Sequence, residues 1–313
     1  MQKAAGRLTP LALAALALAA AAQTPYRYVR AGNPHSRAAA PRGGFALMGG
    51  GTDLDAAFQM CQRSGGGDFL ILRASGTAAY NPYIESRGSR RFACRQNRRE
   101  RLRNSEGRPA PGKRIRRGPC EAQRRLGAAG PPSRREHKRD ARRSRAGARA
   151  NHKLCPQVNS VSTLILPSRA AALAPFASRA IAQASAIFIA GGDQSNYINF
   201  WRHTPVARAL DAAIRRGVPL GGTSAGLAVL GEFAYSAQHD PPNGPDLTAA
   251  AALANPFHPQ VVLVRGFLAI PALREVVTDT HFHNRNRLGR LLVFMARILQ
   301  AGDAARIHGL GID

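Results

Sequence analysis

The sequence has few cysteines, few acidic side chains and no apolar run of membrane-spanning length. Its 4 cysteines and 9 histidines show neither zinc-ligand spacing nor a disulfide framework, so we expect no metal and no other cofactor. The apolar run LALAALALAAAA at residues 11–22 is too short to cross a bilayer, so we expect no transmembrane span. Since 44% of the 313 residues are hydrophobic, the chain can still bury a sizeable core.

Acidic residues number 18 against 45 lysines and arginines, which gives a formal charge of +27. Most of this charge is local, because residues 87–155 hold 24 basic and 5 acidic side chains, a charge of +19. The same stretch has Phe92 as its only aromatic residue and no valine, so it can bury almost nothing. We interpret residues 87–156 as a basic, disordered insertion, and we expect no nucleic-acid partner outside it.

The N-terminus combines a positive start, an apolar run and a return to polar residues. Lys3 and Arg7 precede the run, and Gln23 follows it. This pattern predicts a signal peptide over residues 1–22 and a secreted or periplasmic protein, the alternative being a buried N-terminal helix. Residues 23–86 and 157–313 are then expected to form one discontinuous α/β domain.

Apolar runs alternate with helix-like segments through this domain. The expected strands are GFALMGGG (44–51), DFLILRASG (68–76), STLILP (162–167), AIFIAGGD (186–193) and VPLGG (218–222). The expected helices lie at 53–67, at 176–184 and at 195–217, where Pro205 divides the segment. Continuous apolar strands between helices indicate an α/β fold with a doubly wound, mostly parallel sheet. The glycine-rich turns would then meet at one rim, at the carboxyl ends of the strands.

The turn after residue 48 is not a dinucleotide fingerprint. Leu54 stands where a third glycine would be required after Gly49 and Gly51. We therefore interpret these glycines as allowing a tight strand-to-helix turn.

Ser224 lies between small residues directly after an apolar run. In the stretch Gly222-Thr223-Ser224-Ala225-Gly226 the small neighbours allow the chain to turn abruptly from strand to helix and to expose the hydroxyl. This pattern predicts a nucleophile elbow, the alternative being an ordinary strand-to-helix turn. A serine nucleophile also needs a base within hydrogen-bond reach.

His281 is the best candidate for that base, because it follows a short apolar strand and precedes a helix. Strand alternation does not separate it from His283. Arg285, Arg287 and Arg290 follow at the start of the helix, where cations oppose the helix dipole. They are either a solvated basic face or a set of guanidinium groups that binds carboxylates.

Five motifs in this order resemble one family. They are LMGGGTDLDAAF, GGGDFLILRASGTAAYNPYI, AIFIAGGDQSNYINFW, GVPLGGTSAGLAVLG and DTHFHNRNRLGRL. Together they are similar to the cyanophycinase branch of the serine peptidases that include dipeptidase E. The resemblance implies a flavodoxin-like fold related to class I glutamine amidotransferases. It also implies a serine peptidase that cuts cyanophycin, a poly-aspartate with arginine on each side chain, into β-Asp-Arg dipeptides.

Matched position by position, the resemblance makes Ser224 the nucleophile and His281 the base. It also implies that Gln194 lines the substrate site and that the following residues bind substrate: Asp279, Arg285, Arg287 and Arg290. By position after the nucleophile and on the neighbouring strand end, Ala225 and Gly192 are expected to form the oxyanion hole.

The expected function is thus a secreted serine exopeptidase that degrades a poly-aspartate polymer through an acyl-enzyme. An α-aspartyl dipeptidase and, from another class, a basic polyanion-binding protein with an inactive peptidase fold are the alternatives. A glutamine amidotransferase is disfavoured, because that chemistry normally has cysteine where Ser224 stands. A dimer is compatible with the sequence.

Two departures from the family matter. Residues 87–156 interrupt two segments that are nearly contiguous in the family, and our hypothesis is that this stretch is mistranslated rather than evolved. The family also continues beyond the position of Asp313 with a glutamate that resembles the third member of the triad. On that ground we expect a C-terminally truncated domain with weak or no activity.

Overall fold

The computed structural model describes residues 24–33, 40–51, 59–85 and 158–313, apart from residue 243. The predicted signal peptide (1–22) and the basic insertion (87–156) lie outside the described residues. The described residues fall into two units. One unit includes the described residues up to Ala78 and those from 158 onward, and the other is described at residues 79–85, which include helix α3 (Tyr80–Glu85).

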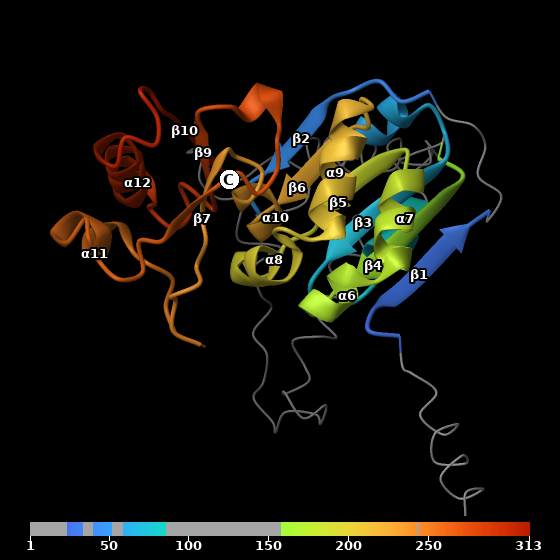
Figure 1. The fold of residues 1–313 in the computed structure, drawn as a ribbon, viewed down its shortest axis with the longest axis horizontal. Helices are drawn as coiled ribbons and strands as arrows, with labels where there is room; N and C mark the ends of the chain where they lie inside the picture. The colour runs from blue at the N-terminus through green and yellow to red at the C-terminus, as the bar shows by residue number, and fades with distance from the viewer. Residues whose placement is uncertain (1–23, 34–39, 52–58, 86–157, 243) are drawn as a thin grey trace, which may run out of the picture. The chain divides into compact units, whose positions relative to one another are not determined.

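The first unit is built on a six-stranded sheet (Figure 1). The strand order is β1 (Arg27–Gly32), β4 (Ser160–Ile165), β3 (Asp68–Arg73), β5 (Ala186–Ile189), β6 (Leu220–Thr223) and β2 (Phe45–Met48). All neighbours are parallel except β1 and β4. The strands β4, β5 and β6 are buried at every residue, as continuous apolar strands in a covered sheet must be. The predicted α/β fold with a mostly parallel sheet is confirmed.

The helices that follow β4 and β5 pack on this sheet. They are α6 (Arg169–Leu173), α7 (Pro175–Gln183), α8 (Gln194–Trp201) and α9 (Pro205–Arg215), and Figure 1 shows α7 and α9 side by side over one face. Pro205 divides α8 from α9 as predicted, because proline fits the first turn of a helix but not its interior. The helix predicted at 53–67 differs, since its described part is a 3₁₀ helix, η1 (Gln59–Ser64).

A second, four-stranded sheet was not expected from the sequence. Its order is β10 (His308–Ile312), β9 (Val276–Thr280), β7 (Phe233–Tyr235) and β8 (Leu263–Arg265), with β7 and β8 antiparallel and the other pairs parallel. Helices α10 (Ala225–Ala228), α11 (Ala249–Ala254) and α12 (Leu288–Gln300) and the 3₁₀ helix η3 (Pro271–Leu273) belong to the same half of the chain. An apolar core that includes Phe233, Tyr235 and Phe294 lies under this sheet.

The two sheets meet through the turns after β2, β6 and β9. The backbone N–H of Ser224 donates to the carbonyl of Met48 at 3.1 Å, and that of His281 donates to the carbonyl of Gly49 at 2.8 Å. The end of β2 therefore lies between the serine and the histidine and fixes the separation of the two turns.

Candidate active site

Ser224 sits on a sharp turn between β6 and α10. Its backbone angles, φ 51° and ψ −122°, lie in a region that few residues other than glycine adopt. The carbonyl of Ser224 accepts hydrogen bonds from the N–H groups of Leu227 and Ala228, both at 2.9 Å. The short helix α10 thus begins at the serine and holds its strained backbone.

The glycines beside Ser224 allow this turn by close packing. A methyl group on Gly226 would lie 2.0 Å from the carbonyl oxygen of Ile189 in β5. One on Gly222 would lie 2.5 Å from the carbonyl oxygen of Gly226 itself. Neither position can carry a side chain, so the two glycines let α10 sit directly on the sheet.

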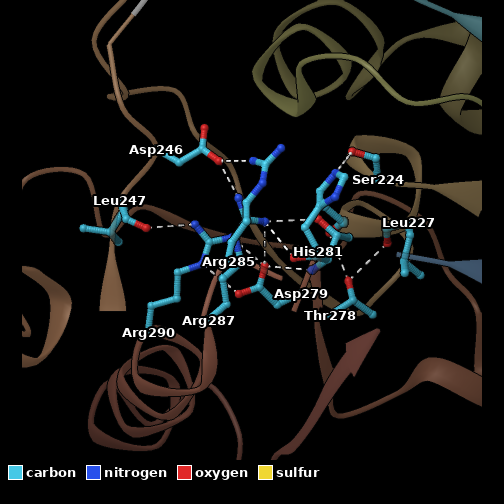
Figure 2. Close-up of polar contacts among 12 residues, drawn as sticks. Ser224, Leu227, Asp246, Leu247, Thr278, Asp279, His281, Arg285, Arg287 and Arg290 are labelled. Atoms are coloured by element: carbon cyan, nitrogen blue, oxygen red, sulfur yellow. Dashed lines mark hydrogen bonds and ion pairs between the residues drawn. The ribbon is translucent and has the colours of Figure 1, made fainter. Parts of the chain in front are cut away.

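His281 lies at the end of β9, and its Nε2 is 2.8 Å from the hydroxyl oxygen of Ser224. Figure 2 shows the imidazole ring and the serine hydroxyl turned toward each other. The hydroxyl of Thr278, also in β9, lies 3.2 Å and 3.1 Å from the carbonyl oxygens of Leu227 and Ala228, to which it donates. This link ties the strand that carries the histidine to the helix that follows the serine.

The pKa of His281 is lowered, first because the ring is partly buried and then because Arg285 and Arg287 are positively charged. Asp246 and Asp313 oppose this shift. A lowered pKa keeps the imidazole neutral near pH 7, and only the neutral ring can take a proton from a hydroxyl.

Gly50 lies against both side chains. Its φ is 103°, and a methyl group built on it would lie 2.5 Å from Cβ of Ser224 and 2.6 Å from Cε1 and Nε2 of His281. The sequence pointed to glycine turns at the rim without singling out this residue. Only its contacts across the fold show that the serine–histidine pair needs a residue without a side chain here.

Of the two expected oxyanion-hole residues, Ala225 lies next to Ser224 and Gly192 lies closer to Tyr197. Ala225 is the first residue of α10, directly after Ser224. A methyl group on Gly191 would lie 3.2 Å from Cβ of Ser224, whereas one on Gly192 would lie 3.1 Å from the hydroxyl of Tyr197. Gly191 is thus the nearer of the two glycines to the serine. Gln194 is the first residue of α8, which begins just after this turn.

Asp279 and Arg290, both expected to bind substrate, form a buried ion pair with each other. Nε and Nη2 of Arg290 lie 2.7 Å and 2.5 Å from the two carboxylate oxygens of Asp279. Arg290 is 1% exposed, and its guanidinium also lies over the rings of Tyr235 and Phe294. The polar atoms of both groups are thus hydrogen-bonded within the protein, and their expected contact with substrate stays a prediction.

The sequence held a signal for the burial of Arg290. Arg290, Phe294 and Ile298 are spaced by four residues, which puts them on one face of α12, and all three are buried. A charge on an apolar helix face must be paired, and Asp279 provides the partner.

Arg287 and Arg285 lie closer to His281. Arg287 is 6% exposed, and its Nη1 donates to the backbone carbonyl of Thr280 at 2.8 Å. Its other terminal nitrogen donates to Asp246. The side chain of Arg285 is half-exposed, and its Nη1 lies 2.5 Å from the same oxygen of Asp246. Asp246 was not predicted, because it stands in a proline-rich loop without a periodic pattern.

The chain matches known proteins over its middle part. Residues 157–287 match peptidase family S51. This part of the chain is similar to that family. The matched residues include Ser224, His281 and the glycine turn before α8.

Curated relatives that the chain matches are cyanophycinases. That of Geminocystis herdmanii is 34% identical over 134 residues, which is 42% of either chain. That of a Nostoc species is 34% identical over 130 residues, 41% of this chain and 37% of the relative. That of Thermosynechococcus vestitus is 33% identical over 138 residues, which is 43% of this chain and 38% of the relative. The match thus spans about two fifths of the length of these relatives. A solved peptidase from an acI-B1 actinobacterium is 15% identical with a TM-score of 0.40, over 82% of this chain and 76% of that one.

Neither a metal site nor a membrane span is found in the described part of the chain. No cluster of three or more histidine, cysteine, aspartate or glutamate residues there could hold a metal ion. None of the described helices combines the length and the apolar character that a membrane crossing requires.

Proposed function

We propose that this protein is a serine-type peptidase that hydrolyses the poly-aspartate backbone of cyanophycin to β-Asp-Arg dipeptides. The observation that carries the proposal is the 2.8 Å contact between Oγ of Ser224 and Nε2 of His281, at the strained turn where β6 meets α10. In this proposal the turn is a nucleophile elbow, and the strained backbone of Ser224 between a strand and a helix supports that assignment. The match to peptidase family S51 and the similarity of the chain to cyanophycinases support the choice of substrate.

The first half of the reaction forms an acyl-enzyme. Oγ of Ser224 attacks the scissile carbonyl carbon while Nε2 of His281 takes the hydroxyl proton. The N–H of Ala225 and the Gly191–Gly192 turn stabilise the oxyanion, which costs little reorganisation because both are fixed backbone. His281 then gives its proton to the departing amine, and the C–N bond breaks.

The second half regenerates the serine. Water replaces the amine beside His281, which takes one proton as the water oxygen attacks the acyl carbon. The ester bond breaks, and His281 returns the proton to Oγ of Ser224. Secretion remains part of the proposal, supported only by the pattern of residues 1–22.

Purified polymer tests the proposal directly. The protein is incubated with cyanophycin, and soluble products are identified by mass spectrometry, with Ser224→Ala as the matched control. We expect β-Asp-Arg from the wild-type protein and none from the variant. Cleavage of free α-aspartyl dipeptides with no release from the polymer would instead identify an α-aspartyl dipeptidase. Release by Ser224→Ala at the wild-type rate would overturn the mechanism.

A further inference from the structure

The carboxylate of Asp246 forms ion pairs with Arg285 and Arg287, the arginines next to His281. One of its carboxylate oxygens, Oδ2, accepts a hydrogen bond from Arg285 and another from Arg287. Figure 2 shows this carboxylate joined to both guanidinium groups, and in this view the Arg285 guanidinium lies between Asp246 and the serine–histidine pair. A group that belongs to the protein therefore fills a site suited to a carboxylate of a substrate.

The two halves of this contact differ in how easily they can open. Arg287 is buried and keeps further acceptors on Thr280 and Asp279 when Asp246 moves away. The side chains of Arg285 and Asp246 are each 50% exposed. Water can solvate both of them as they separate, so the Arg285–Asp246 half opens at low cost.

The backbone next to Asp246 is fixed. Leu247 is buried, and its carbonyl oxygen accepts a hydrogen bond from Nη1 of Arg290 at 3.0 Å. The hydroxyl of Thr248 then caps α11 by accepting from the N–H of Ala251. Exchange at Arg285 therefore needs only a rotation of the Asp246 side chain, and the loop stays in place.

The charge balance favours an anion as the incoming group. Within this hydrogen-bonded cluster three guanidinium groups face two carboxylates, those of Asp246 and Asp279, which leaves one positive charge in excess among these five side chains. The carboxylate of Asp313 also lies near His281, but it accepts from the backbone N–H groups of His283 and Asn284. The excess lies beside the base, because the backbone N–H of Arg285 donates to the carbonyl of His281. A carboxylate of the substrate would neutralise this excess, whereas a cation would add to it.

We propose that Asp246 is a specificity-determining residue that holds Arg285 until a free carboxylate of the substrate displaces it. The inference rests on the proposed peptidase function and adds the group that the substrate must carry near the scissile bond. Substrates without that carboxylate leave Arg285 paired with Asp246. The protein then accepts only chains whose side groups end in a free carboxylate.

Binding to the full chain carrying Ser224→Ala tests this without turnover. The probes are a trimer of β-Asp-Arg units and the same trimer with each arginine α-carboxylate converted to an amide. Calorimetry gives the ratio of the two dissociation constants, with and without Asp246→Asn. We expect the acid to bind about fivefold more tightly after the substitution, since a half-exposed ion pair supports a change of that size. The amide should bind as before.

Two further variants make the result specific. Asp240→Asn removes a carboxylate from the same loop, where Asp240 contacts Tyr235 and Gln260 instead of the arginines, and should leave the ratio unchanged. Arg285→Gln should weaken binding of the acid trimer and abolish the effect of Asp246→Asn on that binding. An unchanged ratio in Asp246→Asn would overturn the inference. Weaker binding of the acid trimer to Asp246→Asn would also overturn it and would indicate that Asp246 contacts a cationic group of the substrate.

The outcomes also separate this inference from the proposed function. Polymer cleavage by the wild-type protein together with an unchanged ratio removes the role of Asp246 alone. The expected ratio together with no cleavage by the wild-type protein removes the peptidase proposal and leaves an anion site.

Discussion

Replacing Gly50 with alanine should disrupt the serine–histidine pair although the residue takes no part in the chemistry. The added methyl would lie 2.5 Å from Cβ of Ser224 and 2.6 Å from the ring of His281. Carbon atoms pack best at about 3.5–4.0 Å, so the contact is short by about 1 Å on both sides. Moving one side chain cannot relieve it, because the methyl group presses on both.

The expected loss follows from that displacement. Moving reacting groups by about 1 Å costs about 100-fold in rate. The φ of 103° adds backbone strain of about 1–2 kcal/mol for any residue with a side chain, which lowers the melting temperature by about 2–8 °C. The rate is measured as labelling of Ser224 by a fluorophosphonate, and the melting temperature is measured by thermal unfolding of the same variant.

The neighbouring glycine provides the matched control. A methyl group on Gly51 meets no described atom within 4 Å, so Gly51→Ala should label at the wild-type rate. If Gly50→Ala reacts within threefold of the wild-type protein, or if both variants lose the same activity, the close packing of Gly50 does not position the pair.

Three further predictions concern the residues around the pair. The labelling rate should rise with pH as His281 loses its proton, with the midpoint of the rise below the ordinary histidine pKa of about 6.5. Arg285→Gln should raise the pKa of His281 and move the rise to higher pH, and a pH profile with no such movement contradicts the electrostatic argument. Arg290→Met leaves the carboxylate of Asp279 buried without its main partner and should cost about 3–5 kcal/mol in urea unfolding, and a loss under about 1 kcal/mol would contradict a buried pair. Thr278→Val removes the donor to two buried carbonyls and should cost about 1–3 kcal/mol and slow labelling; an unchanged labelling rate would show that this link does not position the base.

Much of the main sheet and one half of the site could be predicted from local sequence patterns. Continuous apolar runs gave the central strands, and Pro205 correctly divided α8 from α9. The small residues around Ser224 and the strand before His281 put both on the rim where they meet. Each of these features follows from a few adjacent residues, which is why it can be recognised without the fold.

The rest depends on contacts between distant parts of the chain. Strand β1 pairs antiparallel with β4, although well over a hundred residues separate them in the sequence. Gly50 and Asp246 acquire their roles from neighbours on other strands and loops. Arg290 was expected to bind substrate or to lie on a solvated face, whereas in the fold it is buried against Asp279 and two aromatic rings.

The most direct test of the whole account is the position of a covalent label. The full chain is treated with a fluorophosphonate, digested and mapped by mass spectrometry, beside the His281→Ala variant. The account predicts one modified residue, Ser224, and labelling at least about 100-fold slower without the histidine. A label on another serine, no label on the folded wild-type protein, or equal rates in the two proteins would contradict it.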